Sequence, residues 1–304
     1  MLRYILARIG QSVLVMLGVS ALIFYSLHLT GDPAAVMMPP GSTQQEIDHF
    51  RRSMGFDQPL LWQYVNYLYD LLHGNFGESL RYNQPVTDLI GQRVPATLLL
   101  ATTALAWSTL VGMILGIISA LWQNSIWDLL ARLLAFSGQA IPVFWLGLLL
   151  ILLFSLHLRW LPSGGYGSAS HLVMPVLSLG AYYMSAIARL IRASLIDVLQ
   201  QDYIRTAQAK GLSRWRIVVR HGLRNALIPV VTVQGMYFAS LLGGALVTEI
   251  IFSWPGIGRL AIQAIQNRDF PLVQAIVLLA ALVFVVVNLA IDLLYVLLNP
   301  RIRL

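Results

Sequence analysis

Six stretches of the chain are apolar over a length close to the ~20 residues that a helix needs to cross the hydrocarbon core of a membrane. Few charged side chains interrupt them, and polar or turn-forming segments separate them. They predict six transmembrane helices at Ile9–Leu29, Thr97–Leu121, Leu133–Leu158, Leu172–Ala188, Ala226–Thr248 and Leu272–Ile291. The expected fold class is therefore an all-α membrane protein. The fourth stretch is the shortest, and it contains Pro175.

A long polar stretch, Gly31–Pro95, separates the first two apolar segments and holds seven of the thirteen acidic residues. Between Leu60 and Leu72, leucine and aromatic residues recur at helical spacing, so we expect a helix that packs against the membrane face. The glycines at Gly74 and Gly77 predict a turn directly after that helix. The alternative is that the whole stretch only connects two transmembrane helices.

The composition agrees with a membrane protein. Of 304 residues, 58% are hydrophobic and 11% are charged, against about 25% charged residues in soluble domains. The absence of cysteine excludes disulfides, thiolate metal sites and a cysteine nucleophile. The N-terminal apolar run is longer than the hydrophobic part of a signal peptide and no cleavage motif follows it, so we expect it to remain as the first helix.

Basic residues predict the orientation, because arginine and lysine collect in cytoplasmic loops. If the N-terminus is inside, thirteen of the twenty basic residues are cytoplasmic, eight of them between Arg189 and Arg224. We therefore predict that both ends of the chain are cytoplasmic. The net charge of +7 is then a signal of topology, and we expect no nucleic-acid partner.

The longest predicted cytoplasmic loop has helices of its own. Residues 198–210 favour a helix and include no glycine or proline, and Gly211 is placed to end that helix in the left-handed conformation. Ser213 can cap a second helix that begins at Arg214 and ends near Leu223. This helix–glycine–helix element is either an amphipathic loop held on the membrane by anionic lipid or a docking surface for another protein.

The loop resembles the cytoplasmic signature of binding-protein-dependent ABC permeases. The similarity lies in Ala207-x-x-x-Gly211, with Tyr203-Ile-Arg-Thr before it and Asn225-Ala-Leu-Ile-Pro229 after it. Other motifs, in the same order along nearly the whole chain, are similar to the B-type permeases of dipeptide, oligopeptide, glutathione and nickel importers. These motifs are Gly31-Asp-Pro33, Gly55-Phe-Asp-Gln-Pro59, Gly74-Asn-Phe-Gly77, Pro95-Ala-Thr97, Thr248-Glu-Ile-Ile-Phe-Ser-Trp-Pro-Gly256, Arg268-Asp-Phe-Pro271 and Asn299-Pro-Arg-Ile-Arg303.

The resemblance implies a type I ABC importer permease fold in the bacterial inner membrane, multi-pass, with six helices. It implies three segments: residues 1–94 with the first helix and a periplasmic helical stretch, residues 95–298 with the transmembrane domain, and a cytoplasmic tail at 299–304. The transmembrane domain would hold five helices and a coupling loop at 193–225. The residues implied to couple this chain to an ATPase are Asp202, Tyr203, Ile204, Arg205, Thr206, Ala207, Lys210, Gly211 and Leu212.

The resemblance also implies partners. They are a homologous second permease subunit, two ABC ATPase subunits or domains, a periplasmic substrate-binding protein and membrane lipid. ATP and Mg²⁺ are expected on the ATPase subunits, and no cofactor is expected on this chain. The first helix of the loop would sit in a cleft of an ATPase subunit and pass its closure on to the transmembrane helices.

The loop departs from the general permease pattern in two ways. The pattern begins Glu-Ala-Ala, whereas this chain has Arg205, Thr206 and Ala207 there, which leaves no carboxylate for an ATPase contact at that position. The spacing from Gly211 to Pro229 is also longer. Both departures are features of the peptide and nickel branch of the family.

No residue is assigned to catalysis. The only lysine, Lys210, is followed by Gly211, so the chain lacks the Gly-Lys-Ser/Thr sequence with which a P-loop holds phosphates. No Ser/His/Asp set and no carboxylate pair stands out. We therefore expect a non-catalytic subunit of an ATP-driven translocase.

Glu249 lies at the external end of the fifth predicted helix. One interpretation is a periplasmic gate formed by Glu249 with the turn at Trp254, Pro255 and Gly256, because acidic residues within membrane segments are often functional. The other interpretation is a local hydrogen bond or solvation at the membrane surface.

The substrate class depends on weaker signals. Five of the six histidines are predicted on the external side, and imidazole suits nickel, but no His-x-x-x-His spacing exists and no metal site is assigned. The loop from Arg159 to His171 is short, as in glutathione and nickel permeases. We expect transport of small peptides, either di- or oligopeptides or glutathione-like, with nickel or a nickel chelate as the alternative. An ion-coupled secondary transporter is a further alternative, but internal repeats and midplane carboxylates are not visible.

Overall fold

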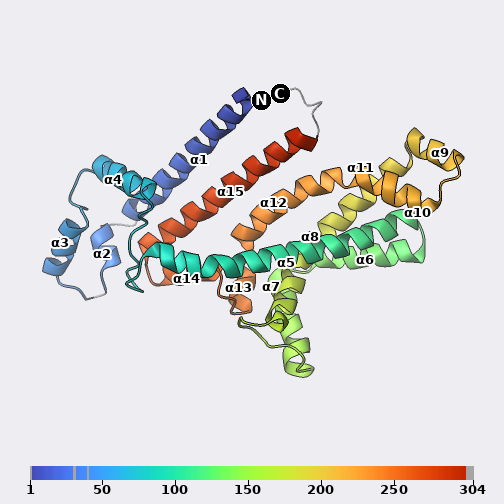
Figure 1. The fold of residues 1–304 in the computed structure, drawn as a ribbon. Coiled ribbons are helices and arrows are strands. Elements are labelled where there is room, and N and C mark those ends of the chain that lie inside the picture. The colour runs from blue at the N-terminus through green and yellow to red at the C-terminus, as the bar shows by residue number, and fades with distance from the viewer. Residues whose placement is uncertain (1, 30–31, 40, 299–304) are drawn as a thin grey trace. The chain divides into compact units, whose positions relative to one another are not determined.

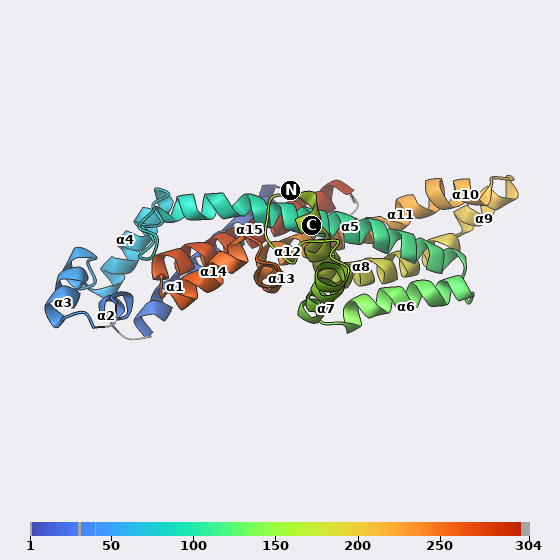
Figure 2. The same ribbon diagram turned by 90° about the horizontal axis from the view of Figure 1, so that it is seen from below.

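The computed structural model describes residues 2–29, 32–39 and 41–298 of the chain (Figures 1 and 2). These residues form helices joined by turns, with no strand beyond an isolated bridge between Glu78 and Pro85. The all-α fold class is confirmed. The predicted tail at 299–304 lies outside the described residues, as does Gly31.

Two compact units make up the chain, and two long helices contribute to both. The first unit contains the residues up to Pro95 together with Gly256–Leu289, and the second contains Ala96–Pro255 together with the residues that follow Leu289 in the last helix. The helices of the first unit are α1 (Leu2–Leu29), α2 (Pro33–Met37), α3 (Gln44–Ser53), α4 (Leu60–Leu72), the start of α5 (Val86–Leu121), α14 (Ile257–Gln266) and most of α15 (Phe270–Leu298).

The helix predicted from leucine spacing in the external stretch is confirmed as α4. It packs on α1, where the Tyr64 hydroxyl donates to the Leu17 carbonyl oxygen at 3.2 Å and lies 2.9 Å from the Ser20 hydroxyl. The turn after it is also present, with both Gly74 and Gly77 at positive φ. The external stretch is therefore folded onto the first transmembrane helix.

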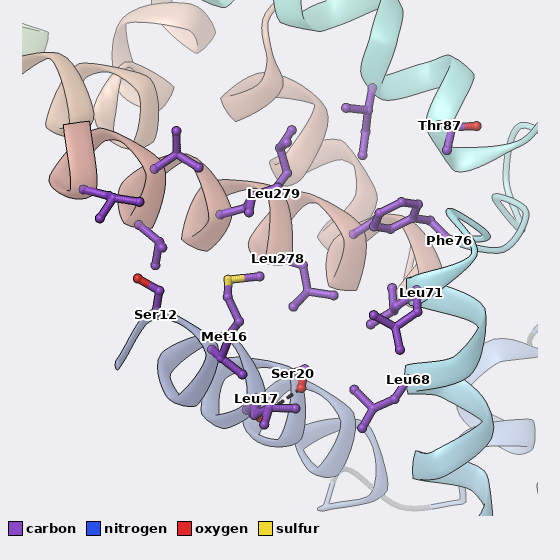
Figure 3. Close-up of a pocket in the computed structure, with 18 of the residues that line it drawn as sticks. Ser12, Met16, Leu17, Ser20, Leu68, Leu71, Phe76, Thr87, Leu278 and Leu279 are labelled. Carbon is purple, nitrogen blue, oxygen red and sulfur yellow. Dashed lines mark hydrogen bonds between the residues drawn. The ribbon is translucent and has the colours of Figure 1, made fainter. Parts of the chain in front are cut away.

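An apolar cavity of about 710 Å³ lies between α1, α4, α15 and the start of α5 (Figure 3). Met16 of α1, Leu68 of α4 and Leu278 of α15 are typical of its wall. Among the described residues, the polar side chains that line it are the hydroxyl groups of Ser12, Ser20 and Thr87. The described part of its wall therefore offers no charged group to a solute.

A buried carboxylate fastens the beginning of α15 in the same unit. Asp269 is fully buried and accepts hydrogen bonds from the Ser79 hydroxyl and from the backbone N–H groups of Leu80 and Leu272, the latter two at 3.3 and 3.4 Å. A buried charge needs such donors to offset its lost hydration. The motif around Asp269 thus ties the segment after α4 to the start of the last helix.

The second unit is built around α8. Its elements are the rest of α5, α6 (Ile126–Ala140), α7 (Val143–Leu150), the π-helix η1 (Ile151–His157), α8 (Ala169–Leu199), α9 (Asp202–Ala209), α10 (Arg214–Arg216), the π-helix η2 (Ile217–Leu223), α11 (Arg224–Ala226), α12 (Ile228–Gly244) and α13 (Leu246–Ile251). Helices α6, α7, α11, α12 and α13 all pack against α8. Figures 1 and 2 show α5 and α6 running alongside α8 towards α9 and α10.

Glycines allow α5 to approach α8 closely. A Cβ atom at Gly112 would lie 2.8 Å from the Met184 carbonyl oxygen, and one at Gly116 would lie 2.6 Å from the Ala188 carbonyl oxygen. Glycines four residues apart form the small-residue face that lets membrane helices touch along their backbones. On α6, Gly138 meets the backbone of α8 in the same way.

The count of membrane-spanning helices agrees with the prediction, although two spans are bent. Within the described residues, four helices are long and apolar enough to span a membrane alone, and the total rises to six if two bent helix pairs each count as one span. One pair is α6 with α7 and η1, bent by 104°, so a straight helix over Leu133–Leu158 is wrong. The reason is Pro142, which holds Ile141 in an extended conformation and ends α6.

The fourth and fifth predicted spans also differ from the observed helices, in both cases near a proline. Pro175 does not end α8, which continues for 31 residues and well beyond the predicted Ala188. The second bent pair joins residues 214–227 to 229–242 at an angle of 41°, with the bend next to Pro229. Proline inside a membrane helix is tolerated where neighbouring helices and side chains satisfy the freed backbone groups.

The predicted orientation is testable with truncated fusions to alkaline phosphatase, which is active only where its disulfides form, outside the cytoplasm. A fusion after Asn66, in α4, should be active, and a fusion after Ser213, before α10, should be silent. Green fluorescent protein at the same two positions should give the reverse pattern. An active fusion after Ser213 would overturn the model in which both termini are cytoplasmic.

Candidate functional site

The loop that resembles the permease signature folds into a short helix, a turn and a longer helix. Helix α8 ends at Leu199, Gln201 is extended, and α9 begins at Asp202. The predicted single helix over residues 198–210 is therefore wrong, because the chain turns at Gln200–Gln201. This turn lets α9 fold its apolar face onto the helix that follows it.

The buried face of α9 is a small hydrophobic cluster. Ile204 has no exposed surface and Ala207 is 7% exposed, and both pack with Ile217 at the start of η2. Leu199 at the end of α8 and Leu212 in the turn complete the cluster. Burying an isoleucine side chain stabilises a fold by about 1.5–3 kcal/mol. The cluster therefore holds α9 against both α8 and η2 without help from another chain.

The opposite face of α9 is exposed and polar. Arg205 and Asp202 lie 3.6 Å apart with side chains 74% and 96% exposed, so this ion pair adds little to stability. Thr206 and Lys210 are also exposed. Tyr203 is half exposed, and its hydroxyl oxygen accepts a hydrogen bond from the Asn225 side chain at 2.9 Å. This face can contact a partner without any loss of internal packing.

Gly211 ends α9 as the sequence predicts, in the left-handed conformation with φ +76°. The Gly211 N–H donates to the Gln208 carbonyl at 2.9 Å, and the Leu212 N–H donates to the Ala207 carbonyl at 3.3 Å. These two bonds form a Schellman motif, in which glycine is preferred because a Cβ atom strains a left-handed residue. No atom lies within 4 Å of where a Cβ of Gly211 would be. The preference for glycine therefore comes from the left-handed backbone conformation alone and not from crowding.

The second helix of the loop begins at Arg214, as predicted, although the Ser213 side chain makes no capping bond. Instead, the Arg214 guanidinium donates to the carbonyl oxygen of Leu121 at 2.9 Å. Leu121 is the last residue of α5, and a cation at this end of a helix interacts favourably with its unpaired carbonyls and dipole. The loop is thereby anchored to α5 as well as to α8.

The predicted gate residues form a second, buried cluster in the same unit. Glu249 on α13 is fully buried and accepts a hydrogen bond from the Thr97 hydroxyl at 2.8 Å, so solvation at the membrane surface is excluded. Trp254 is 1% exposed, and its indole N–H donates to the Ala96 carbonyl at 2.9 Å. The backbone N–H of Trp254 also donates to the Glu249 carbonyl at 2.8 Å. A role of this cluster as a gate stays a prediction.

The short external loop lies on this cluster. The Gly165 N–H donates to the Phe252 carbonyl at 2.8 Å, and the Tyr166 ring meets the Trp254 ring edge to face with centroids 4.9 Å apart. Pro255 follows Trp254 in the same unit, whereas Gly256 belongs to the first unit as the N-cap residue of α14. Thr97, Phe252 and Tyr166 were not among the predicted site residues.

The histidines in the described part of the chain do not gather into a metal site. No group of three or more His, Asp or Glu side chains there is arranged to hold a metal ion. Both ring nitrogens of His28 lie 3.1 Å from oxygen atoms, one on Phe24 and one on Gln63. The ring of His171 contacts the Ser168 hydroxyl at 2.7 Å. These two imidazoles are therefore engaged in local hydrogen bonds.

Two family models match the chain. The model described as "Binding-protein-dependent transport system inner membrane component" matches residues 112–304, and the N-terminal model of such membrane components matches residues 1–101. The first match includes the whole signature loop together with Glu249 and Trp254, and it covers more than half of the chain. The chain belongs to this family of ABC importer permeases. It is a multi-pass protein of the bacterial inner membrane.

Curated relatives match the permease over its full length. The glutathione transport system permease protein GsiC of Escherichia coli strain K12 is 44% identical over 304 residues, which covers 100% of this chain and 99% of that protein. GsiC of Shigella flexneri serotype 5b shows the same identity and coverage.

Solved structures show the same fold at low sequence identity. The inward-facing MetNI methionine ABC transporter matches with a TM-score of 0.59 and 17% identity, over 69% of this permease and 96% of that chain. An amino acid ABC transporter solved with histidines matches with a TM-score of 0.51 and 18% identity, over 71% and 95% of the two chains. These similarities support the fold, and they carry no information on the substrate.

The buried indole of Trp254 gives a prediction for stability. Replacing Trp254 by Phe keeps a buried ring but removes the N–H that binds the Ala96 carbonyl, which should cost about 1 kcal/mol. The apparent melting temperature of the purified permease in detergent should fall by a few degrees. The matched control is Trp215→Phe, because Trp215 is 73% exposed, and it should leave the melting temperature unchanged. Equal melting temperatures for wild type and Trp254→Phe would show that this hydrogen bond is dispensable.

Proposed function

We propose that this permease forms the pore of an ABC importer that carries glutathione or a similarly small peptide across the inner membrane, driven by ATP hydrolysis on partner subunits. The observation that carries the substrate class is the 44% identity to a glutathione permease over the whole of both chains. The complex would contain a homologous second permease, two ATPase subunits or domains and a periplasmic binding protein. ATP and Mg²⁺ would bind the ATPase subunits.

The proposed contact with the ATPase is the exposed face of α9. Its outward side chains, among them Tyr203, Arg205 and Lys210, can enter a cleft of the partner, while Ile204 and Ala207 keep the helix attached to the permease. Because only Gln200 and Gln201 separate α9 from α8, a displacement of α9 acts directly on a transmembrane helix. This is the physical basis of the proposed coupling.

The proposed external gate is the cluster of Glu249 and Trp254 with the turn through Pro255 and Gly256. A buried carboxylate and a buried indole, each hydrogen-bonded to the start of the second unit on α5, hold the end of α13 against that helix. If α5 moved, it would either break these hydrogen bonds or take the end of α13 with it. The position on the predicted external side supports a role in opening towards the binding protein.

A first experiment tests the coupling. Gly211→Val forces a β-branched residue into the left-handed region, at a cost of about 1–2 kcal/mol or more, and should deform the turn after α9. In reconstituted complex, the amount of substrate transported per ATP hydrolysed should fall severalfold. The matched control is Gly211→Asn, since asparagine tolerates this conformation and should retain coupling. Membrane insertion of both variants is checked by expression level. Wild-type coupling in a well-inserted Gly211→Val protein would refute the role of this turn.

A second experiment tests partners and substrate together. Affinity purification of the permease should recover an ABC ATPase and a second permease, identified by mass spectrometry. The recovered complex, in proteoliposomes with its binding protein, should take up labelled glutathione only when ATP is supplied. Unlabelled glutathione should compete, and Ni²⁺ should not. ATP-dependent nickel uptake without glutathione uptake would make nickel the substrate, and uptake without any ATPase would refute the importer assignment.

A further inference from the structure

A hollow of about 350 Å³ lies between α5, α6 and α8, on the side of these helices that leads to the basic loop. Its wall contains three arginines, Arg132 on α6 and Arg189 and Arg192 on α8. The remaining wall is small or apolar, with four alanines, Leu115 and Phe136, and with the Ser119 hydroxyl as the other polar group. A hollow with three guanidinium groups and apolar walls suits an anion that also carries hydrocarbon.

The arginines are only partly neutralised. Asp128 is fully buried behind the hollow, and the Nε atoms of Arg132 and Arg192 lie 3.1 and 3.4 Å from its carboxylate. The Arg192 Nε also donates to the Ser119 hydroxyl at 2.8 Å. Arg189 is exposed, and it forms no ion pair within the described residues. One carboxylate therefore pairs with two guanidinium groups through their Nε atoms, which leaves their outer N–H₂ groups to point elsewhere, and Arg189 adds a third positive charge to the wall.

An apolar groove continues from the hollow towards the middle of the same helices. This groove, of about 240 Å³, shares Leu115 with the hollow and is lined by Val111 on α5, Ile141 at the end of α6 and Met184 on α8. Every one of these residues lies further from the basic loop along its helix than the arginines do. The lining thus changes from basic in the hollow to apolar in the groove, in the direction that leads away from the basic loop.

The depth of the arginines matches the boundary between lipid headgroups and hydrocarbon. Arg132 lies six residues after the start of α6, and Arg192 lies seven residues before the end of α8, each about 10 Å from its helix end. Helix α8 is about 46 Å long, so it extends beyond the ~30 Å hydrocarbon core by about 8 Å on each side. Both arginines are therefore placed at the edge of the hydrocarbon core, from which their long side chains can extend to the lipid phosphates.

We propose that this hollow binds the phosphate of an anionic phospholipid from the cytoplasmic leaflet, with an acyl chain in the adjoining apolar groove. Guanidinium groups bind phosphate oxygens through paired N–H donors, and basic pockets between transmembrane helices on the cytoplasmic side suit such headgroups. A free inorganic anion would leave the apolar continuation unexplained. The bound lipid would brace α6 against α8 at their basic ends.

The test uses the full chain, purified in mild detergent with any subunits that accompany it, and counts lipid adducts by native mass spectrometry. The probes are phosphatidylglycerol, phosphatidylcholine with the same acyl chains, and inorganic phosphate. Wild type should bind phosphatidylglycerol more tightly than phosphatidylcholine. Arg189→Gln should weaken phosphatidylglycerol binding about fivefold, the effect of one basic residue at a membrane surface. Arg189 is the informative position because it does not hold Asp128.

Three further variants sharpen the result. Arg189→Lys keeps the charge and should bind within about twofold of wild type. Ala193→Trp fills the exposed wall of the hollow without changing charge and should also weaken binding. Arg216→Gln removes an exposed charge outside the hollow and should have no effect.

Four outcomes would overturn the proposal. Equal binding of phosphatidylglycerol and phosphatidylcholine would remove the headgroup selectivity. Phosphatidylglycerol binding that is unchanged in both Arg189→Gln and Ala193→Trp would place the lipid elsewhere. Displacement of the lipid by inorganic phosphate at equal concentration would indicate a site for free anions. Lipid adducts that disappear when a second permease subunit is present would make this face a protein interface.

Discussion

The close approach of α5 and α6 to α8 determines the arrangement of the second unit. Inside a membrane no hydrophobic effect drives helices together, because lipid chains are as apolar as leucine, and association depends on van der Waals packing and hydrogen bonds. Gly112 and Gly116 bring the α5 backbone into contact with the α8 backbone, and Gly138 does the same for α6. The Ser185 hydroxyl adds a hydrogen bond from α8 to the Ala135 carbonyl of α6. Any larger side chain at these glycines would separate the helices and move everything attached to their ends.

The position of the signature loop depends on this packing, because the loop contacts the ends of α8 and α5. Leu199, at the end of α8, packs in the hydrophobic cluster of α9 and also in the cluster of Ala120, Leu195 and Ala226 that joins α5, α8 and α11. Arg214 adds a polar link to the end of α5. Because these contacts are internal, the exposed face of α9 is already formed before a partner binds. Preorganisation of this kind lowers the entropy cost of association.

Local signals in the sequence located much of the fold. The spacing of apolar residues from Leu60 to Leu72 gave α4, and Gly211 gave the end of α9, because both depend on residues close together in the chain. The breaks at Pro142 and at Gln200–Gln201 were missed. The first had a signal in the residue before proline, but the second has no glycine or proline and arises because α9 buries Ile204 against Ile217.

The candidate sites were predictable only in part for the same reason. Glu249 and Trp254 could be found from their motif, but the partner Thr97 lies 152 residues away along the chain. No periodicity or spacing connects residues at that separation. Likewise, the arginines on α6 and α8 read as a topology signal in the sequence, and only the packing of the helices shows that they share one hollow.

Because α8 is one long continuous helix, its two ends move together when it tilts. The helix is about 46 Å long and is gripped along its middle by glycine contacts on two sides. With the middle held, a tilt of about 5° would move each end by about 2 Å, which is enough to break a hydrogen bond. At one end lies the two-residue joint to α9, and just beyond the other lies Gly165, bonded to Phe252 next to the buried Trp254. In the proposed coupling, a small tilt imposed at the basic end would therefore strain or release a contact near the opposite end of the helix.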